Sequence, residues 1–152
     1  MSVPSKDEIA AKAAQAMWAQ DRASKHLGME IVSATSGKAS LRMKVRAEFC
    51  NGHAICHGGF IFTLADSTFA FACNSHNKVT VANNCAITFV AAAKEGDVLT
   101  ASAVEVHRGG RSGVTEVEVR DQDAKLIALF RGHSTQIKGE LVPGLTPEDL
   151  QK

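Results

Sequence analysis

The central stretch of the chain reads Asn51-Gly-His-Ala-Ile-Cys-His-Gly-Gly-Phe-Ile-Phe-Thr-Leu-Ala-Asp66. A polar loop fills its first half, and an apolar run over residues 60–73 follows the two glycines. Glycines that open a helix leave its first N–H groups free and closely approachable, which favours binding of negative charge. A carboxylate inside an apolar helix is costly unless it is hydrogen-bonded or functional. The stretch therefore predicts an oxyanion donor at Gly58 or Gly59 and a base or nucleophile at Asp66.

The same residues also have structural interpretations that the sequence leaves open. Asp66 could be bonded to a nearby threonine or to the backbone, and Asn51-Gly52 could be no more than a turn. The side chains that could suggest a zinc site fit none of the usual ligand spacings, so no metal is predicted; they are Cys50, His53, Cys56 and His57.

Length and charge limit the function classes. The chain has 152 residues, which suits one domain with a single core, and its formal net charge is +1. Lys and Arg are scattered, so neither a nucleic-acid surface nor a polybasic membrane surface is expected. No apolar run reaches the ~18 residues of a membrane span, and no signal peptide is evident. The cytoplasm is the expected compartment, and the four cysteines, which form no CxxC pair, are expected to be reduced thiols.

Secondary structure follows from the spacing of apolar residues. Residues 6–25 favour a helix, with Ser5 and Glu8 forming a capping box and Trp18 anchoring the helix to the body. Strict alternation over residues 38–47 indicates a half-buried strand whose inward positions are Ala39, Leu41, Met43 and Val45. This strand should pair in a hairpin with residues 29–35.

The second half of the chain has the pattern of strands separated by short turns. The predicted strands cover residues 79–90, 97–106, 114–120 and 125–137. Their order predicts a four-strand antiparallel meander that curls around the apolar helix, and therefore an α+β domain. Strands 97–106 and 114–120 are candidates for exposed pairing edges or dimer surfaces. Residues 126–130 are continuously apolar, so that strand is expected to be covered on both faces.

The spacing within the central stretch resembles that of the hot-dog fold thioesterases, and most of all the PaaI group of phenylacetic-acid degradation. The likeness spans about residues 27–137 and rests on Asn51-x5-His57-Gly58-Gly59-x6-Asp66, then a strand ending in Phe89, then Gly96-Asp97-Val98-Leu99. It implies a hot-dog domain over residues 27–138, in which an antiparallel sheet wraps around a long central helix. An N-terminal helical segment (1–26) and a loose C-terminal tail (139–152) flank this domain.

The resemblance also implies roles for individual residues. In the family the acid on the central helix activates water or attacks the thioester, the first glycine donates its N–H to the thioester oxygen, and the Asn orients the reacting groups. These roles fall on Asp66, Gly58 and Asn51. His57 would hold the turn or lie near the departing sulfur, and Gly59 would border the substrate. No cofactor is implied.

One departure from the family concerns the coenzyme A phosphates. Many relatives have Arg-Pro after the strand where this chain has Ala91-Ala92. Candidates to replace that arginine are Arg108, Lys94 and above all the turn Gly109-Gly110-Arg111-Ser112, because a glycine-rich turn with a cation can approach a phosphate closely. A plain hairpin turn is the competing interpretation.

The expected substrate is an aryl-acetyl-CoA, such as phenylacetyl-CoA or its hydroxylated forms, or another medium acyl-CoA. Apolar walls for the acyl group are expected from helix residues Phe60, Phe62, Leu64, Phe69 and Phe71. Two alternatives remain: an acyl-thioester hydratase or dehydratase, which would use His57 as proton carrier, and a non-catalytic acyl-CoA binding module.

Helix geometry predicts an active site shared between subunits. Asp66 follows Gly58 by eight positions, so the two lie ~12 Å apart along one helix. A single thioester carbon must lie within a few ångströms of both. Two copies of the helix, antiparallel about a two-fold axis near Phe62, would bring Gly58 of one to Asp66 of the other. We therefore expect at least a homodimer, and a homotetramer as the complete assembly.

Overall fold

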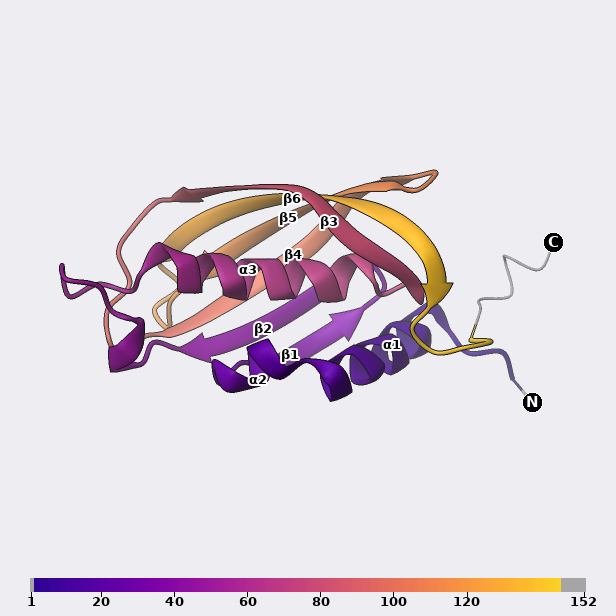
Figure 1. The fold of residues 1–152 in the computed structure, drawn as a ribbon, viewed down its shortest axis with the longest axis horizontal. Coiled ribbons are helices and arrows are strands. Elements are labelled where there is room, and N and C mark those ends of the chain that lie inside the picture. Colours follow the sequence, from indigo (N-terminus) through magenta and orange to yellow (C-terminus); the bar gives the residue numbers. More distant parts are fainter. Residues whose placement is uncertain (1, 146–152) are drawn as a thin grey trace.

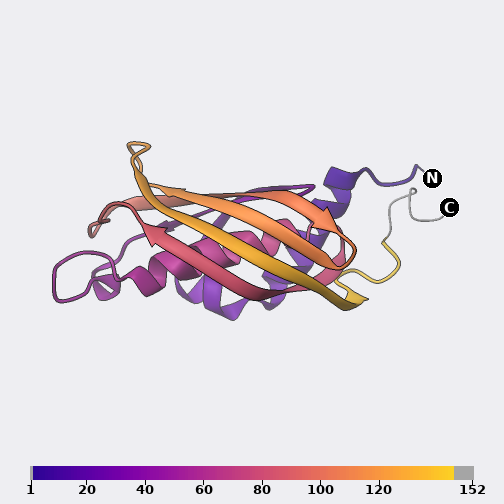
Figure 2. The ribbon, with the colours of Figure 1, turned by 90° about the horizontal axis from the view of Figure 1, so that it is seen from above.

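Helix α3 (Gly58–Cys73) lies along the concave face of a six-stranded antiparallel sheet in the computed structural model, which describes residues 2–145 (Figure 1). Seen from above, the strands pass obliquely over this helix (Figure 2). The other elements are α1 (Lys6–Gln20), α2 (Arg22–His26), β1 (Glu30–Thr35), β2 (Lys38–Lys44), a 3-10 turn (Ala47–Phe49), β3 (Lys78–Phe89), β4 (Val98–Gly109), β5 (Ser112–Arg120) and β6 (Leu126–Glu140). The α+β hot-dog architecture is confirmed.

The N-terminal segment is two helices and not the single one expected over residues 6–25. The capping box is present, because Ser5 Oγ accepts from the Glu8 N–H and the Glu8 carboxylate accepts from the Ser5 N–H. Asp21 has extended backbone angles and its side chain accepts from the Ser24 N–H, so it ends α1 and caps α2. Trp18 packs against Phe71 of α3, with ring centroids 6.2 Å apart, which confirms its anchoring role.

The hairpin of β1 and β2 follows the predicted alternation. Ala39, Leu41, Met43 and Val45 are each at most 3% exposed and belong to the core. Their neighbours in β2 alternate toward solvent, so a single face of the strand packs on α3.

The strand order β1-β2-β4-β5-β6-β3 corrects the expected four-strand meander. Strands β4, β5 and β6 do form a meander, but β3 pairs with β6 and β4 pairs with β2. The connection over residues 90–97 can cross the open end of the sheet, because eight extended residues reach about 26 Å and strands three positions apart are only about 14 Å apart. The short connection between β3 and β4 predicted that these two strands are neighbours in the sheet. In the curled sheet the connection instead joins strands that are three positions apart.

The edges of the sheet also differ from the prediction. Strands β4 and β5 are interior, so the expectation that they are exposed pairing edges is wrong; the edges are β1 and β3. The expectation that residues 126–130 are covered on both faces is wrong as well. Ile127 and Ala128 are fully buried, but Leu129 is 43% exposed on the outer face of the sheet.

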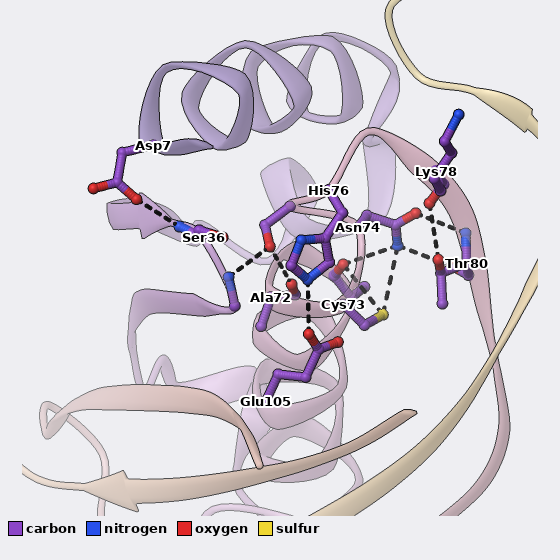
Figure 3. Close-up of polar contacts among 12 residues, drawn as sticks. Asp7, Ser36, Ala72, Cys73, Asn74, His76, Lys78, Thr80 and Glu105 are labelled. Carbon is purple, nitrogen blue, oxygen red and sulfur yellow. Dashed lines mark hydrogen bonds and ion pairs between the residues drawn. The ribbon is translucent and has the colours of Figure 1, made fainter. Parts of the chain in front are cut away.

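Polar contacts fix the C-terminal end of α3 (Figure 3). The Asn74 amide donates to the Ala70 and Thr80 carbonyls, and its oxygen accepts from the Thr80 N–H, each at 2.9 Å. His76 Nε2 lies 2.7 Å from Glu105 Oε1, and the Glu105 side chain is only 7% exposed. These bonds join the C-terminal end of α3 to β3 and the segment after α3 to β4.

Part of the C-terminal segment is anchored and not loose as expected. The Asn77 amide donates to the Val142 and Leu145 carbonyls, and its oxygen accepts from the Val142 N–H. Residues 146–152 of the expected tail lie outside the described residues. Within the described chain, none of the helices has the length and apolarity to cross a membrane.

Replacing Gly132 with Ala should destabilise the fold through its contact with α3. A Cβ at this β6 position would lie 2.7–2.8 Å from three ring atoms of Phe69, which is itself 1% exposed and has little room to move. Overpacking of this kind lowers the free energy of unfolding by about 1–3 kcal/mol. Urea titration measures the loss. Gly52→Ala is the matched control, because nothing lies within 4 Å of its added Cβ.

Candidate active site

The loop before α3 is closed at its base by a short antiparallel bridge between Cys50 and Cys56. The Asn51 N–H donates to the Ile55 carbonyl at 2.9 Å, and Asn51 Oδ1 accepts from the His53 N–H at 2.9 Å. Asn51 therefore forms the turn that the structural interpretation expected. Its Nδ2 has no hydrogen-bond partner within residues 2–145 and stays available to a substrate.

The start of α3 distinguishes between its two glycines. His57 is the N-cap residue, and its Nδ1 accepts from the Gly59 N–H at 2.9 Å. The N–H of Gly58, the first helical residue, has no acceptor in the described chain. An unpaired N–H at a helix start is the group that can bind an oxyanion. In the described chain the Gly58 N–H is therefore available to an acceptor, whereas the Gly59 N–H is held by the His57 ring at the helix start.

Phe89, at the end of β3, covers Gly58 and was not singled out by the sequence as a site residue. A Cβ added to Gly58 would lie 2.7 Å from the Phe89 ring, so only glycine lets the ring approach this closely. The ring is on an exposed side chain and borders an open hollow of about 420 Å³, within the usual range of ligand pockets. The hollow is lined by Asn51, Ile55, Cys56, Gly58, Ile61, Phe89, Val90, Ala91 and Ala92.

Asp66 lies half-buried in the middle of α3. The threonines that could have satisfied it bond elsewhere: Thr63 Oγ1 donates to the Gly59 carbonyl and Thr68 Oγ1 to the Leu64 carbonyl. No hydrogen bond to the Asp66 carboxylate occurs among residues 2–145. Burial raises the pKa of Asp66 above its usual value. A desolvated carboxylate without a structural partner has the properties of a base or nucleophile.

Asp66 opens into a second hollow, separate from the one at Gly58. Its lining includes Met17, Phe69 and residues 79–82 of β3. Asp66 does not line the Gly58 hollow. One chain therefore does not assemble the donor and the acid around a single point.

The predicted phosphate turn lies at the other end of α3. Residues Gly110, Arg111 and Ser112 form the β4–β5 turn, which borders a small polar hollow together with Cys73 at the C-terminus of α3. In Figure 1 this hairpin and the loop at residues 50–57 lie at opposite ends of the molecule. Arg111 is exposed, and its carbonyl accepts from the Gln136 N–H at 2.7 Å. The structure thus does not bring this turn near Gly58 within one chain.

The expected apolar walls need correction. Leu64, Phe69 and Phe71 are at most 2% exposed and belong to the core, although Phe69 also borders the hollow at Asp66. Phe60 and Phe62 are only partly buried, but neither lines the hollow at Gly58 or the hollow at Asp66. Among the described residues, no group of three His, Cys, Asp or Glu side chains is arranged to hold a metal.

Comparison with known proteins identifies the family to which the chain belongs. A sequence model described as "Thioesterase superfamily" matches residues 53–128. Acyl-coenzyme A thioesterase PaaI of Escherichia coli (strain K12) is 44% identical over 128 residues, which are 84% of this chain and 91% of that protein. The chain belongs to the thioesterase superfamily. The resemblance to the PaaI group is confirmed, and the protein is a thioester hydrolase.

Solved structures of this superfamily agree with the fold. The E. coli PaaI structure superposes with a TM-score of 0.88 at 43% identity, covering 90% of this chain and 99% of that one. A Streptococcus mutans protein bound to acetyl-CoA superposes with a TM-score of 0.70 at 26% identity, covering 74% of this chain and 90% of that one. The superfamily fold thus extends over most of the thioesterase described here.

Proposed function

We propose that this thioester hydrolase cleaves acyl-CoA thioesters, with Gly58 as oxyanion donor and Asp66 as base or nucleophile. The observation that carries the proposal is the state of these two groups. In the described chain the Gly58 N–H is left unpaired at a helix start, and Asp66 is desolvated with no hydrogen-bond partner. The relatives support the substrate class, since one is named an acyl-coenzyme A thioesterase and another was solved with acetyl-CoA.

The chemistry needs few groups because a thiolate leaves readily. The thioester oxygen accepts a hydrogen bond from the Gly58 N–H, which stabilises the negative charge that develops there. Asp66 either takes a proton from the attacking water or attacks the carbonyl carbon itself. The Asn51 Nδ2 orients the reacting groups. The C–S bond then breaks, and the products are the free acid and coenzyme A.

The two groups meet if two chains pair along β3. Within residues 2–145 this edge strand has an unpaired side, and it carries the exposed apolar residues Val81 and Phe89 (43% and 50% exposed), with Val90 (51%) directly after its end. Such an edge favours pairing with a second chain. Residues 79–82 of β3 flank the hollow at Asp66, so pairing there would place two α3 helices side by side and antiparallel. Gly58 of one subunit would then face Asp66 of its partner, in a homodimer or a homotetramer built from it.

The coenzyme A phosphates are assigned to the β4–β5 turn of the assembled enzyme. Arg111 is an exposed cation beside Gly110, whose φ of 59° leaves a turn that a phosphate can approach closely. Ser112 adds a hydroxyl donor. Gly59 contributes close approach only, because its N–H is already bonded to His57.

A panel of acyl-CoA thioesters tests the activity and its range. The hollow at Gly58 is lined by Ile55, Ile61 and Phe89, and its size suits a medium or aromatic acyl group. Phenylacetyl-CoA, its hydroxylated forms and medium acyl-CoAs should therefore give kcat/KM values about tenfold or more above palmitoyl-CoA. The measurement is release of free thiol. Binding of every thioester without thiol release would identify a binding module, and rates that climb steadily to the longest chain would contradict the pocket assignment.

The rate should depend on the ionisation of Asp66. Only the carboxylate can act as base or nucleophile, and burial raises its pKa above the usual 3.8. Activity should therefore be full above that raised pKa and be lost as the pH falls through it. A profile of kcat/KM against pH should show an acidic limb with a midpoint above that of a free aspartate. The same limb in the residual activity of an Asp66→Asn variant would exclude Asp66 as its source.

A further inference from the structure

The bridge at the base of the catalytic loop is a pair of cysteines in a specific geometry. The Asn51 N–H donates to the Ile55 carbonyl at 2.9 Å, and the His57 N–H donates to the Phe49 carbonyl at 2.7 Å. These bonds flank the pair Cys50↔Cys56 and are not made by the pair itself. The cysteines therefore form a non-hydrogen-bonded antiparallel pair, in which the Cα atoms are about 4.5 Å apart and the side chains are closest.

This geometry suits a disulfide. Paired residues on antiparallel strands point to the same side, and disulfides span Cα separations of about 4.4–6.8 Å. Both thiols are free, and among the residues that the structure describes they make only long polar contacts: Cys50 Sγ is 3.8 Å from the Arg46 carbonyl oxygen, and Cys56 Sγ is 3.6 Å from that of His57. Neither contact holds its sulfur firmly against rotation toward the other cysteine.

We propose that Cys50 and Cys56 are a redox-active pair that closes reversibly to an intrachain disulfide in reaction with a small-molecule disulfide. The Cys50 thiolate attacks the oxidant RSSR, forming a mixed disulfide and releasing one RS⁻. The Cys56 thiolate then attacks the Cys50 sulfur, forming the intrachain bond and releasing the second RS⁻. The protein loses two electrons and two protons, and the oxidant is reduced to two RSH.

The surroundings of the two thiols determine which of them reacts first with the oxidant. Cys50 is partly exposed and can meet the oxidant, whereas Cys56 is only 4% exposed. Burial, with contributions from Cys50 and Asp97, raises the pKa of Cys56 to about 11, so its thiolate is scarce at neutral pH. Cys56 is thus the resolving thiol, and ring closure is the slower step.

Closure would restrain a functional segment. The ring spans residues 50–56 and contains Asn51, and Cys56 lines the hollow beside Gly58. A disulfide at the base of the loop limits local opening of the loop, so amide hydrogen exchange over residues 51–55 should slow by about tenfold or more on oxidation. The state of the pair would then couple the substrate loop to the thiol–disulfide balance around the enzyme.

The test treats the full-length enzyme with oxidised glutathione at pH 8.5, quenches it with iodoacetamide and digests it with chymotrypsin. Cleavage after Phe49 and Phe60 isolates a peptide of residues 50–60 that contains only these two cysteines. We expect this peptide unalkylated and lighter by two hydrogens, with alkylation restored by dithiothreitol. Cys56→Ser should instead accumulate glutathione on Cys50, and Cys50→Ser should leave Cys56 reduced.

Two results would overturn the proposed disulfide pair, and a third would overturn its coupling to the substrate loop. The first is a wild-type peptide that keeps both thiols after prolonged oxidation. The second is oxidation that links two chains on a non-reducing gel or joins Cys73 to Cys85. The third is unchanged amide exchange over residues 51–55 once the disulfide has formed, which would show that closure does not restrain the loop.

Discussion

Replacing Asp66 with Asn should lower kcat by about 10²–10⁴-fold while the protein stays folded. The substitution keeps the shape of the side chain and removes the carboxylate that takes a proton or attacks the carbonyl in the proposed mechanism. No hydrogen bond to the Asp66 carboxylate occurs in the described chain, so the substitution removes no structural bond of the side chain. Thiol release from the best acyl-CoA of the panel gives the rate.

The same variant should be more stable than the wild type, and this separates a catalytic defect from misfolding. Burial raises the folded-state pKa of Asp66, so the carboxylate costs stability above that pKa. Asn carries no charge, and its Tm should be higher at pH 7. The difference should vanish as the pH falls below the unfolded-state pKa of aspartate, where both side chains are neutral. Hydrolysis at near wild-type rates by a folded Asp66→Asn enzyme would remove Asp66 from the mechanism.

Mixed assemblies of two inactive variants should regain activity if the site is shared between subunits. Gly58→Pro removes the proposed donor N–H, and proline suits this position because Gly58 is the first helical residue and His57 before it is extended, with ψ of 133°. Loss of one oxyanion donor should lower kcat by about 10²–10³-fold. Gly58→Ala is the matched control, since it adds a carbon against Phe89 but keeps the N–H.

Co-expression of Gly58→Pro and Asp66→Asn chains with different affinity tags allows tandem purification of the mixed assembly. In a shared-site dimer one of the two sites then has both intact groups, so activity should recover to about half of wild type per dimer. If each site lay within one chain, every site would keep one defect and nothing would recover. A verified heterodimer without recovery, or a fully active monomer, would refute the shared site.

The sequence was sufficient for those features that depend on local chemistry. The Ser5–Glu8 capping box, the alternating strand β2 and the apolar helix α3 follow from neighbouring residues and formed as predicted. The His57-Gly58-Gly59 spacing predicted a helix start able to bind an anion. The superfamily confirms the thioester chemistry that this pattern implied.

Only the tertiary structure decided how the local pieces combine. Strand β3 lies beside β6 because of the curl of the whole sheet, and the lengths of the turns do not predict that curl. The Gly59 N–H is bonded and the Gly58 N–H is left unpaired in the described chain because of the orientation of the His57 ring. The ring that covers Gly58 belongs to Phe89 on β3, far away in the sequence. In the described chain the Asp66 carboxylate has no hydrogen-bond partner, because the hydroxyls of Thr63 and Thr68 donate to helix carbonyls. Sequence determines which groups are present and their local periodicity, whereas the pairing of those groups is set by packing between segments far apart in the chain.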